Sequence, residues 1–184
     1  IGKTDTGIIC LQEIQDKTQY EYIKHKLNYK NGVYSNHKCL LTNYNIINSD
    51  AVKYTSLGLY NYRDFLHCVL KVNDMRLNVI TIHLTNDITG FKQDNEKKEI
   101  LEYIYKNNID NVIVIGDTNC IDYFDHNDKL NMLKKWSLSG TFPSYFPCFS
   151  FDKAYTKNVD MLSKQILPEK ISDHMAISYV FSII

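Results

Sequence analysis

The chain lacks several features that mark common classes of protein. Its 21 Lys and Arg residues are balanced by 21 Asp and Glu residues, so it has no global positive charge of the kind that favours nucleic acid, although a local basic rim is compatible with a neutral total. No apolar stretch approaches the roughly 18 residues that a membrane span requires, and the first residues do not form a secretory signal. We therefore expect an intracellular protein of the cytoplasm or nucleus, with no signal or transmembrane segment in this chain.

Cysteine, glycine and proline are sparse or carry no pattern. No pair among the five cysteines has CxxC spacing, which argues against a zinc site, and their odd number suits a reduced compartment better than a disulfide framework. With only seven glycines and three prolines, the chain contains no flexible linker, and it has no repeat or low-complexity tract. These features predict a single domain over residues 1–184, long enough to bury a continuous core.

The apolar residues that are present predict a series of strands. We expect strands at residues 7–12, 38–42, 66–72, 76–84, 112–116, 149–155 and 176–183. Asn73-Asp74 favours a tight hairpin between the third and fourth of these strands. The run at 112–116 is wholly apolar, as expected for a central strand that is covered on both faces.

Helical spacing separates some of these runs. Helices are expected between Glu13 and Gly32, where Gly32 could end the helical region, at residues 90–108, and at about residues 127–136. In the second helix an apolar stripe of Ile100, Leu101 and Ile104 faces the core, and residues 96–99 form the solvated face. Strands with interspersed helices predict an α/β sandwich with mixed sheets.

Four short motifs in a fixed order hold the side chains that could carry chemistry. Each lies beside an apolar run, and together they supply Glu13, His83, Asp117, Asn119, Asp173 and His174. The C-terminal ends of strands in an α/β protein can direct such side chains into one crevice. There, carboxylate oxygens would suit a hard divalent cation and imidazoles would suit a phosphate. The combination predicts metal-assisted phosphoester cleavage.

Each motif alone also has a plainer interpretation. Glu13 could be the first polar residue of a solvated helix, residues 117–119 could form an Asx-type turn, and His174 could be a surface histidine. His83 could be a hydrogen-bonded core residue, and Arg63, a candidate phosphate clamp, could be a solvated surface arginine. The joint occurrence of the motifs, in this order, favours the functional interpretation.

The partner of His174 can be predicted from chain geometry. Neighbouring side chains on a chain rarely face each other, so Asp173 is a poor candidate for orienting the imidazole of His174. Asp152, in the short apolar run near residues 149–155, is the better candidate.

These motifs resemble those of the endonuclease/exonuclease/phosphatase superfamily, the deoxyribonuclease I-like fold. Residues 11–13 are similar to the family's Leu-Gln-Glu signature, and residues 81–84 to its Thr-x-His-Leu element. Residues 116–119 resemble its Gly-Asp-Phe/Thr-Asn motif, and residues 172–174 its Ser-Asp-His motif. Phe151-Asp152 looks like its late strand with an orienting Asp, and Arg63 corresponds to its Arg ahead of the middle strand. The resemblance covers residues 8–184.

The resemblance implies a fold, a reaction and a set of roles. The fold is a four-layer α/β sandwich, with two mixed β-sheets packed face to face and helices outside. The reaction is in-line attack of water on phosphorus. The roles are a general base (Asp117), a group that positions water or phosphate (Asn119), ligands for Mg²⁺ or Mn²⁺ (Glu13 and Asp173), and phosphate-binding histidines (His83, and His174 oriented by Asp152).

The chain departs from the family at its start. Family members open with a strand that carries a site Asn, and no such strand precedes Glu13 here, which implies a fold without its first strand and an N-terminally truncated chain. The function expected is a monomeric phosphodiesterase of the nuclease type, acting on nucleic acid. The alternatives are a phosphatase or phospholipase acting on an inositol phosphate, a lipid such as sphingomyelin or a small phosphate ester, and a catalytically silent binding module.

Overall fold

The structure is a computed structural model of the 184-residue chain. It describes residues 7–55, 63–87, 90–120, 130, 133–137, 140–168 and 172–184. The described elements, in chain order, are β1 (Ile8–Leu11), α1 (Lys17–Lys26), β2 (Asn31–Ser35), β3 (Lys38–Thr42), β4 (Asn45–Lys53), β5 (Asp64–Val72), β6 (Met75–His83), α2 (Phe91–Lys106), β7 (Val112–Asp117), β8 (Lys134–Ser137), β9 (Asp152–Lys157), β10 (Val159–Ile166) and β11 (Ile177–Ile183).

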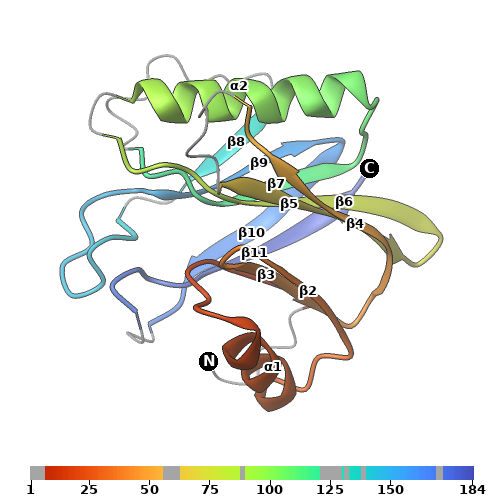
Figure 1. The fold of residues 1–184 in the computed structure, drawn as a ribbon, viewed down its shortest axis with the longest axis horizontal. Helices are drawn as coiled ribbons and strands as arrows, with labels where there is room; N and C mark the ends of the chain where they lie inside the picture. Colours follow the sequence, from red (N-terminus) through yellow and green to blue (C-terminus); the bar gives the residue numbers. More distant parts are fainter. Residues whose placement is uncertain are drawn as a thin grey trace.

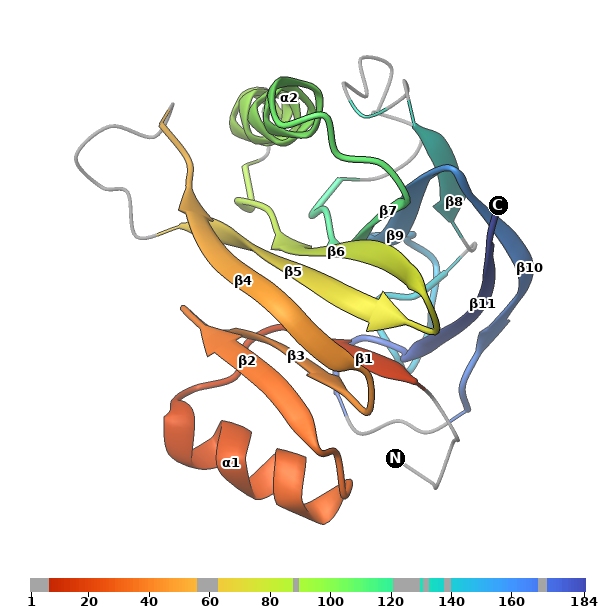
Figure 2. The same cartoon turned by 90° about the vertical axis from the view of Figure 1, so that its right-hand side faces the viewer.

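Two layers of strands lie between two helices (Figures 1 and 2). The larger layer is a six-stranded sheet of order β4-β5-β6-β7-β9-β8, which is mixed because β6 and β7 run parallel while the other pairs are antiparallel. Helix α2 covers its outer face. The facing layer consists of an antiparallel sheet, β1-β3-β2, with α1 outside it, and a β10-β11 pair. This arrangement confirms the predicted four-layer sandwich, with β1 as the first strand among the described residues.

The core explains why β7 is wholly apolar. Val112 and Val114 pack with Ile100 and Ile104 in the cluster between the six-stranded sheet and α2. Ile113 points to the other face and joins the cluster between the two strand layers. Because successive residues of a strand face opposite sides, a central strand covered on both faces has no position for a polar residue. The prediction for residues 112–116 is confirmed.

Several predicted elements differ from the structure. Gly32 does not end the first helix, which stops at Lys26; it lies within β2, where an added Cβ would meet the Tyr20 hydroxyl at 2.7 Å and the Leu41 side chain at 2.9 Å. The predicted helix at 127–136 falls mainly outside the described residues. Its last three residues belong to β8, so that part of the prediction is wrong.

The prediction that residues 96–99 form a solvated face is wrong for two of the four. Glu96 and Lys97 are both 0% exposed, whereas Lys98 is exposed. Both buried residues lie on the face of α2 that also carries Ile100 and Ile104, and the Glu96 carboxylate accepts two hydrogen bonds from Thr85 there. Neither helix in the described part of the chain is long and apolar enough to cross a membrane.

Candidate active site

Three predicted site residues stand side by side at one edge of the six-stranded sheet. Since β6 and β7 are parallel, their C-terminal ends meet, and His83 is paired with Asp117 in register. On the other side of β7, Asp117 is paired with Asp152, the first residue of β9. Strand pairing alone therefore places an imidazole and two carboxylates next to one another.

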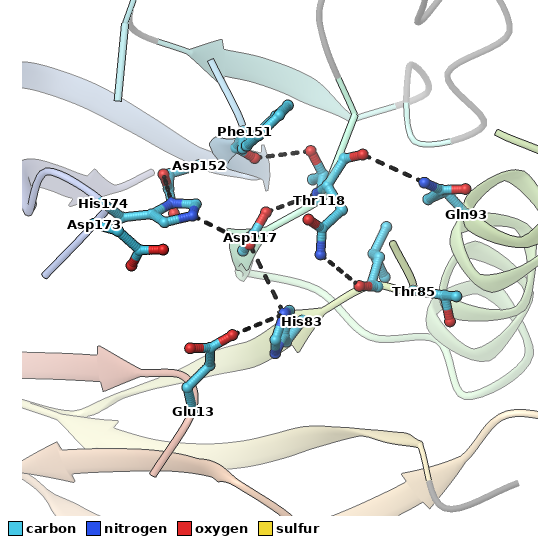
Figure 3. A network of polar contacts seen from close by, with 12 residues as sticks. Glu13, His83, Thr85, Gln93, Asp117, Thr118, Phe151, Asp152, Asp173 and His174 are labelled. Atoms are coloured by element: carbon cyan, nitrogen blue, oxygen red, sulfur yellow. Dashed lines mark hydrogen bonds and ion pairs between the residues drawn. The ribbon is translucent and has the colours of Figure 1, made fainter. Parts of the chain in front are cut away.

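The facing strand layer and its loops contribute the remaining predicted side chains to this edge of the sheet. Glu13 follows β1 and has a left-handed backbone, with φ of 61°, a conformation uncommon for non-glycine residues and often found at functional sites. Asp173 and His174 lie in the loop before β11. Together with the sheet edge they line a pocket of about 100 Å³ (Figure 3), whose lining residues are Gln12, Glu13, His83, Asp117, Asp152, Ser172, Asp173 and His174.

Asp117 is the centre of this pocket. Its Oδ2 lies 3.8 Å from Nε2 of His83 and 3.9 Å from Nε2 of His174, while its Oδ1 accepts the backbone N–H of Asn119 at 2.7 Å. One carboxylate oxygen is thus fixed by the backbone. The other faces two imidazoles at distances too long for hydrogen bonds, so neither ring donates to it directly.

His174 is held by the residue predicted to orient it. Its Nδ1 lies 2.9 Å from Oδ2 of Asp152, and its ring packs against Phe142, with 4.8 Å between ring centroids. With Nδ1 bonded to a carboxylate, Nε2 is directed at Asp117 and the pocket. The geometry supports the predicted Asp152–His174 pair.

Gly116 is required by the close approach of two strands. Its φ is 144°, and an added Cβ would lie 2.0 Å from the carbonyl oxygen of Ile82, far inside any contact distance. It lies within β7 and lets β6 and β7 pack closely just before His83 and Asp117.

Two predicted residues do not line the pocket. The Asn119 side chain donates from Nδ2 to the carbonyl oxygen of Leu84 at 2.9 Å, and its backbone bond to Asp117 is the Asx-type turn that was the plainer interpretation of this motif. Arg63 donates from its guanidinium to the carbonyl oxygen of His83 at 3.2 Å. Both residues therefore brace the ends of β6 and β7 in this structure.

The surroundings of the pocket shift the pKa values of its three central side chains, Asp117, His83 and His174. Burial, followed by the negative charge of Asp152, raises the pKa of Asp117 to about 6. Burial, with the positive charges of Arg63 and Lys38, lowers the pKa of His83 to about 4. This imidazole is therefore neutral at pH 7, and its contacts with Glu13 and Asp117 are not ion pairs.

His174 is shifted in the opposite direction. Burial alone would lower its pKa, but the hydrogen bond to Asp152 and the charges of Asp152, Asp117 and Asp173 outweigh burial and raise it. The pocket thus combines a carboxylate whose pKa is raised to about 6, a neutral imidazole, and an imidazole whose pKa is raised by neighbouring carboxylates. A strong separation of protonation states in one small pocket is typical of catalytic sites.

Sequence reasoning missed the charged pair behind His83. Lys38 and Asp64 form a buried ion pair with 2.7 Å between Nζ and Oδ1, and Ser35 donates to the second oxygen of Asp64 at 3.3 Å. Lys38 stands at the start of an apolar strand, and its burial could have been inferred only by knowing that Asp64 lies opposite it in the other strand layer.

The donor chemistry fits a hydrated magnesium ion better than a fully enclosed metal. Among the described residues, no three His, Cys, Asp or Glu side chains are arranged to hold a metal ion by themselves. Mg²⁺, however, keeps several waters and needs only one or two carboxylates. Glu13, with 76% of its side chain exposed, and Asp173 both present carboxylates to the pocket.

Comparisons with known proteins support the fold. No family model matches the chain, and no curated protein matches it. Among solved structures, it is similar to an endonuclease/exonuclease/phosphatase from Bacteroides vulgatus, with a TM-score of 0.78 and 15% identity over 97% of this chain and 85% of the other. It is similar to D. rerio TDP2 complexed with a single-strand DNA product, with a TM-score of 0.77 and 16% identity over 97% and 86%. A sphingomyelinase C from Streptomyces griseocarneus has a TM-score of 0.68 and 13% identity over 95% and 86%.

Proposed function

We propose that this chain, which has the deoxyribonuclease I-like fold, is a divalent-metal-dependent phosphodiesterase that cleaves a phosphoester by in-line attack of water. The observation that carries the proposal is the position of the Asp117 carboxylate between the Nε2 atoms of His83 and His174, at 3.8 and 3.9 Å. A proton acceptor flanked by a neutral imidazole and by one whose carboxylate partner favours its charged form suits a reaction in which water loses a proton while negative charge builds up on phosphorus-bound oxygens.

The residues take separate roles in this proposal. Asp117 accepts the proton of the attacking water, because a pKa of about 6 leaves it mostly ionised at neutral pH but still basic enough to act. His174 donates from Nε2 to a phosphate oxygen, and Asp152 holds it in that orientation. His83 donates as a neutral imidazole. Asn119 and Arg63 would reach the phosphate only if substrate draws their side chains away from the carbonyl groups they now contact.

Glu13 and Asp173 would hold Mg²⁺ or Mn²⁺. The ion, when bound, would polarise a phosphate oxygen and neutralise charge in the transition state. Glu13 suits this role because its carboxylate is exposed and lies 3.9 Å from Nε2 of His83, too far for a hydrogen bond. The burial of His83 and its depressed pKa keep that imidazole from competing as a cation.

Nucleic acid is the proposed substrate. The residues that follow the second and last motifs, Thr85-Asn86-Asp87 and Met175-Ala176, contain no basic side chain, whereas an inositol-phosphate enzyme would need cations for its additional phosphates. The similar TDP2 structure holds a single-strand DNA product, which supports the same substrate class for this chain.

Metal dependence provides the first test. We expect Mg²⁺-dependent cleavage of a single-stranded oligonucleotide, followed by gel electrophoresis, and complete loss of cleavage in chelator. Glu13→Gln should raise the Mg²⁺ concentration needed for half-maximal rate by about 10- to 100-fold. Glu102→Gln, which alters an exposed carboxylate on α2 with 64% of its side chain accessible, is the matched control and should leave the metal requirement unchanged.

Other outcomes would redirect or overturn the proposal. Turnover of sphingomyelin or of an inositol phosphate, without cleavage of DNA or RNA, would keep the reaction class and change the substrate. A well-folded protein with no metal-dependent turnover on any of these substrates would instead be a silent binding module.

A further inference from the structure

An exposed apolar turn lies next to the pocket. Residues 145–149, Tyr-Phe-Pro-Cys-Phe, are all exposed, and we call this segment the aromatic turn. Tyr145 is 78% exposed and Phe146 71%. Runs of consecutive exposed apolar residues are unfavourable in a soluble domain unless they bind something. Folding alone gives no reason for these two rings to face solvent.

The aromatic turn is fixed to the rim of the pocket. Ser144 donates its backbone N–H to the carbonyl oxygen of Asp173 at 2.7 Å and its hydroxyl to the carbonyl oxygen of Ser172 at 2.6 Å. Both acceptors belong to residues that line the pocket. The N–H of Phe146 bonds to the carbonyl oxygen of Pro143 at 3.0 Å and closes the turn. The exposed rings therefore begin one residue away from a direct contact with the pocket wall.

Stacked rings support the turn from behind. Phe142 stacks on Phe151 with centroids 5.3 Å apart, and Phe149 stacks on Phe151 at 5.9 Å. Phe142 also packs on His174. Because the base of the turn is packed and hydrogen-bonded, little conformational freedom would be lost when a flat ligand binds to its exposed side.

We propose that Tyr145 and Phe146 form a stacking platform for an unpaired nucleobase next to the phosphate in the pocket. This proposal rests on the proposed function and narrows its substrate to single-stranded or frayed nucleic acid. Every base has an aromatic face, so stacking binds single strands without reading sequence. A membrane surface is the less suitable occupant, because membrane-binding segments usually combine apolar and basic residues, and residues 140–152 contain no Lys or Arg.

The test separates stacking from phosphate binding. Binding of fluorescein-labelled oligothymidylate and of an abasic oligonucleotide of equal length is measured by fluorescence anisotropy at one salt concentration, with Mg²⁺ present. The Asp117→Asn background keeps the ligand intact. Tyr145→Ala/Phe146→Ala should weaken oligothymidylate binding by about 10- to 100-fold and abolish the preference over the abasic strand. Tyr22→Ala, which removes an exposed ring from α1, is the matched control and should not change either affinity.

Two results would contradict the stacking platform and leave the proposed reaction unaffected. One is equal binding of oligothymidylate and abasic strand by the protein with intact Tyr145 and Phe146. The other is binding to phosphatidylcholine vesicles that depends on these two rings while oligothymidylate binding does not. Conversely, base-dependent binding would stand even if the unsubstituted protein cleaved nothing, because the assay does not depend on turnover.

A second inference comes from two buried polar side chains of α2, Glu96 and Gln93, of which Figure 3 shows Gln93. Glu96, with 0% exposure, accepts the backbone N–H of Thr85 at 2.8 Å and the Thr85 hydroxyl at 2.6 Å. Gln93, with 1% exposure, donates from Nε2 to the carbonyl oxygens of Asp87 at 2.9 Å and Asn119 at 3.3 Å. One helix face thus holds both loops that leave the site, the one after β6 and the one after β7.

We infer that Glu96 and Gln93 are positioning residues for His83 and Asp117. Burying a carboxylate is unfavourable, and helix α2 could pack on the sheet with an apolar residue at this position. Thr85 lies two residues after His83, and Asn119 two residues after Asp117, so fixing these loops fixes the ends of the two strands that present the catalytic groups. The inference depends on the proposed function for its kinetic consequence only.

Amide hydrogen exchange and steady-state enzyme kinetics together test this inference. Glu96→Ala should accelerate amide hydrogen exchange of residues 83–87, measured by mass spectrometry, and lower kcat about tenfold with little change in KM. Glu96→Gln should restore most of both, since its amide can accept the Thr85 N–H and donate to the Thr85 hydroxyl. Glu102→Ala is the control on the same helix. Unchanged exchange in Glu96→Ala, or a Glu96→Gln variant as impaired as Glu96→Ala, would refute the positioning role.

Discussion

Asp117→Asn is expected to eliminate phosphoester cleavage and, at neutral pH, to make the protein more stable. The catalytic loss should be at least about 10³-fold in kcat, because the amide cannot accept the proton of the attacking water. The geometry should survive, since the Asn side-chain oxygen can still accept the Asn119 N–H that now bonds to Oδ1 of Asp117. Loss of activity would therefore reflect lost chemistry, not a lost fold.

The gain in stability follows from the raised pKa of Asp117. Its value in the folded protein is about 6, compared with 3.8 for an unperturbed Asp, mainly because burial disfavours the charged form. The folded state therefore binds this proton more tightly than the unfolded state, and stability falls as pH rises from about 4 to above 6. At pH 7 to 8 the ionised carboxylate costs on the order of 3 kcal/mol, and Asn removes that cost.

Thermal unfolding at two pH values tests the argument. In chelator, Asp117→Asn should raise Tm by on the order of 10 °C at pH 7.5 and should raise it little or not at all at pH 4, where both proteins are neutral at this position. Asp74→Asn, at a fully exposed carboxylate, is the control and should show neither effect. An equal shift at both pH values would mean that something other than the charge of Asp117 is responsible.

The opposition between stability and activity at Asp117 supports a functional role. A buried, partly desolvated carboxylate beside a second carboxylate is unfavourable for folding. The protein nevertheless places Asp117 and Asp152 opposite each other on β7 and β9. Structural ion pairs can also perturb pKa values. Here, however, the negative charge of Asp152 raises the pKa of Asp117 and so adds to the free-energy cost of folding.

The parts of the site that could be predicted from sequence are those carried by local apolar runs. The wholly apolar strand β7 and the alternating strand β6 were recognisable, and so were His83 and Asp117 at their ends. Their register could be expected once both strands were taken as neighbours in one sheet. Adjacency in the chain argued against Asp173 as the partner of His174, and the resemblance of Phe151-Asp152 to the family's late strand indicated Asp152.

Strands β4 and β10 were not predicted, because their sequences lack such apolar runs. Strand β4 has few buried positions and a mixed polar sequence, Asn-Ile-Ile-Asn-Ser-Asp-Ala-Val-Lys, as suits an edge strand with little core to contact. Strand β10 has one buried residue, Val159, and half of its residues are exposed. Their conformation is set by pairing with β5 and β11, and pairing between distant segments leaves no periodic trace in either one.

The bracing residues could not be predicted for a related reason. The charges of Glu96 and Lys97 indicate solvent, yet their helical spacing from Ile100 and Ile104 places them on the buried face of α2. There the Glu96 carboxylate accepts two hydrogen bonds from Thr85, a tertiary contact that the sequence does not reveal. Asn119 and Arg63 have residue types that suit phosphate, but their side chains bond to backbone carbonyl groups, and no sequence pattern distinguishes the two uses.

Asp152→Asn should lower kcat by about 10²-fold and shift the whole pH–rate profile toward lower pH. Asp152 raises the pKa of His174 through a 2.9 Å hydrogen bond and its charge, so its loss lets His174 deprotonate at lower pH and moves the alkaline limb down. Asp152 also raises the pKa of Asp117, so the acidic limb moves down as well. The drop in kcat follows because an imidazole without its carboxylate partner is less firmly oriented and less often cationic.

The shift of both limbs of the pH–rate profile distinguishes an electrostatic role of Asp152 from a structural one. If Asp152 only supported packing, its replacement would lower the rate at every pH and leave both limbs in place. Rates of oligonucleotide cleavage between pH 5 and 10, at saturating Mg²⁺, separate these cases, and Asp160→Asn provides a control, since that carboxylate lies on β10 and pairs with Lys134. A profile reduced in height but unshifted would rule out the assignment of Asp152 as the partner that keeps His174 charged. A shift of the alkaline limb alone would mean that Asp117 is not the group that titrates on the acidic side.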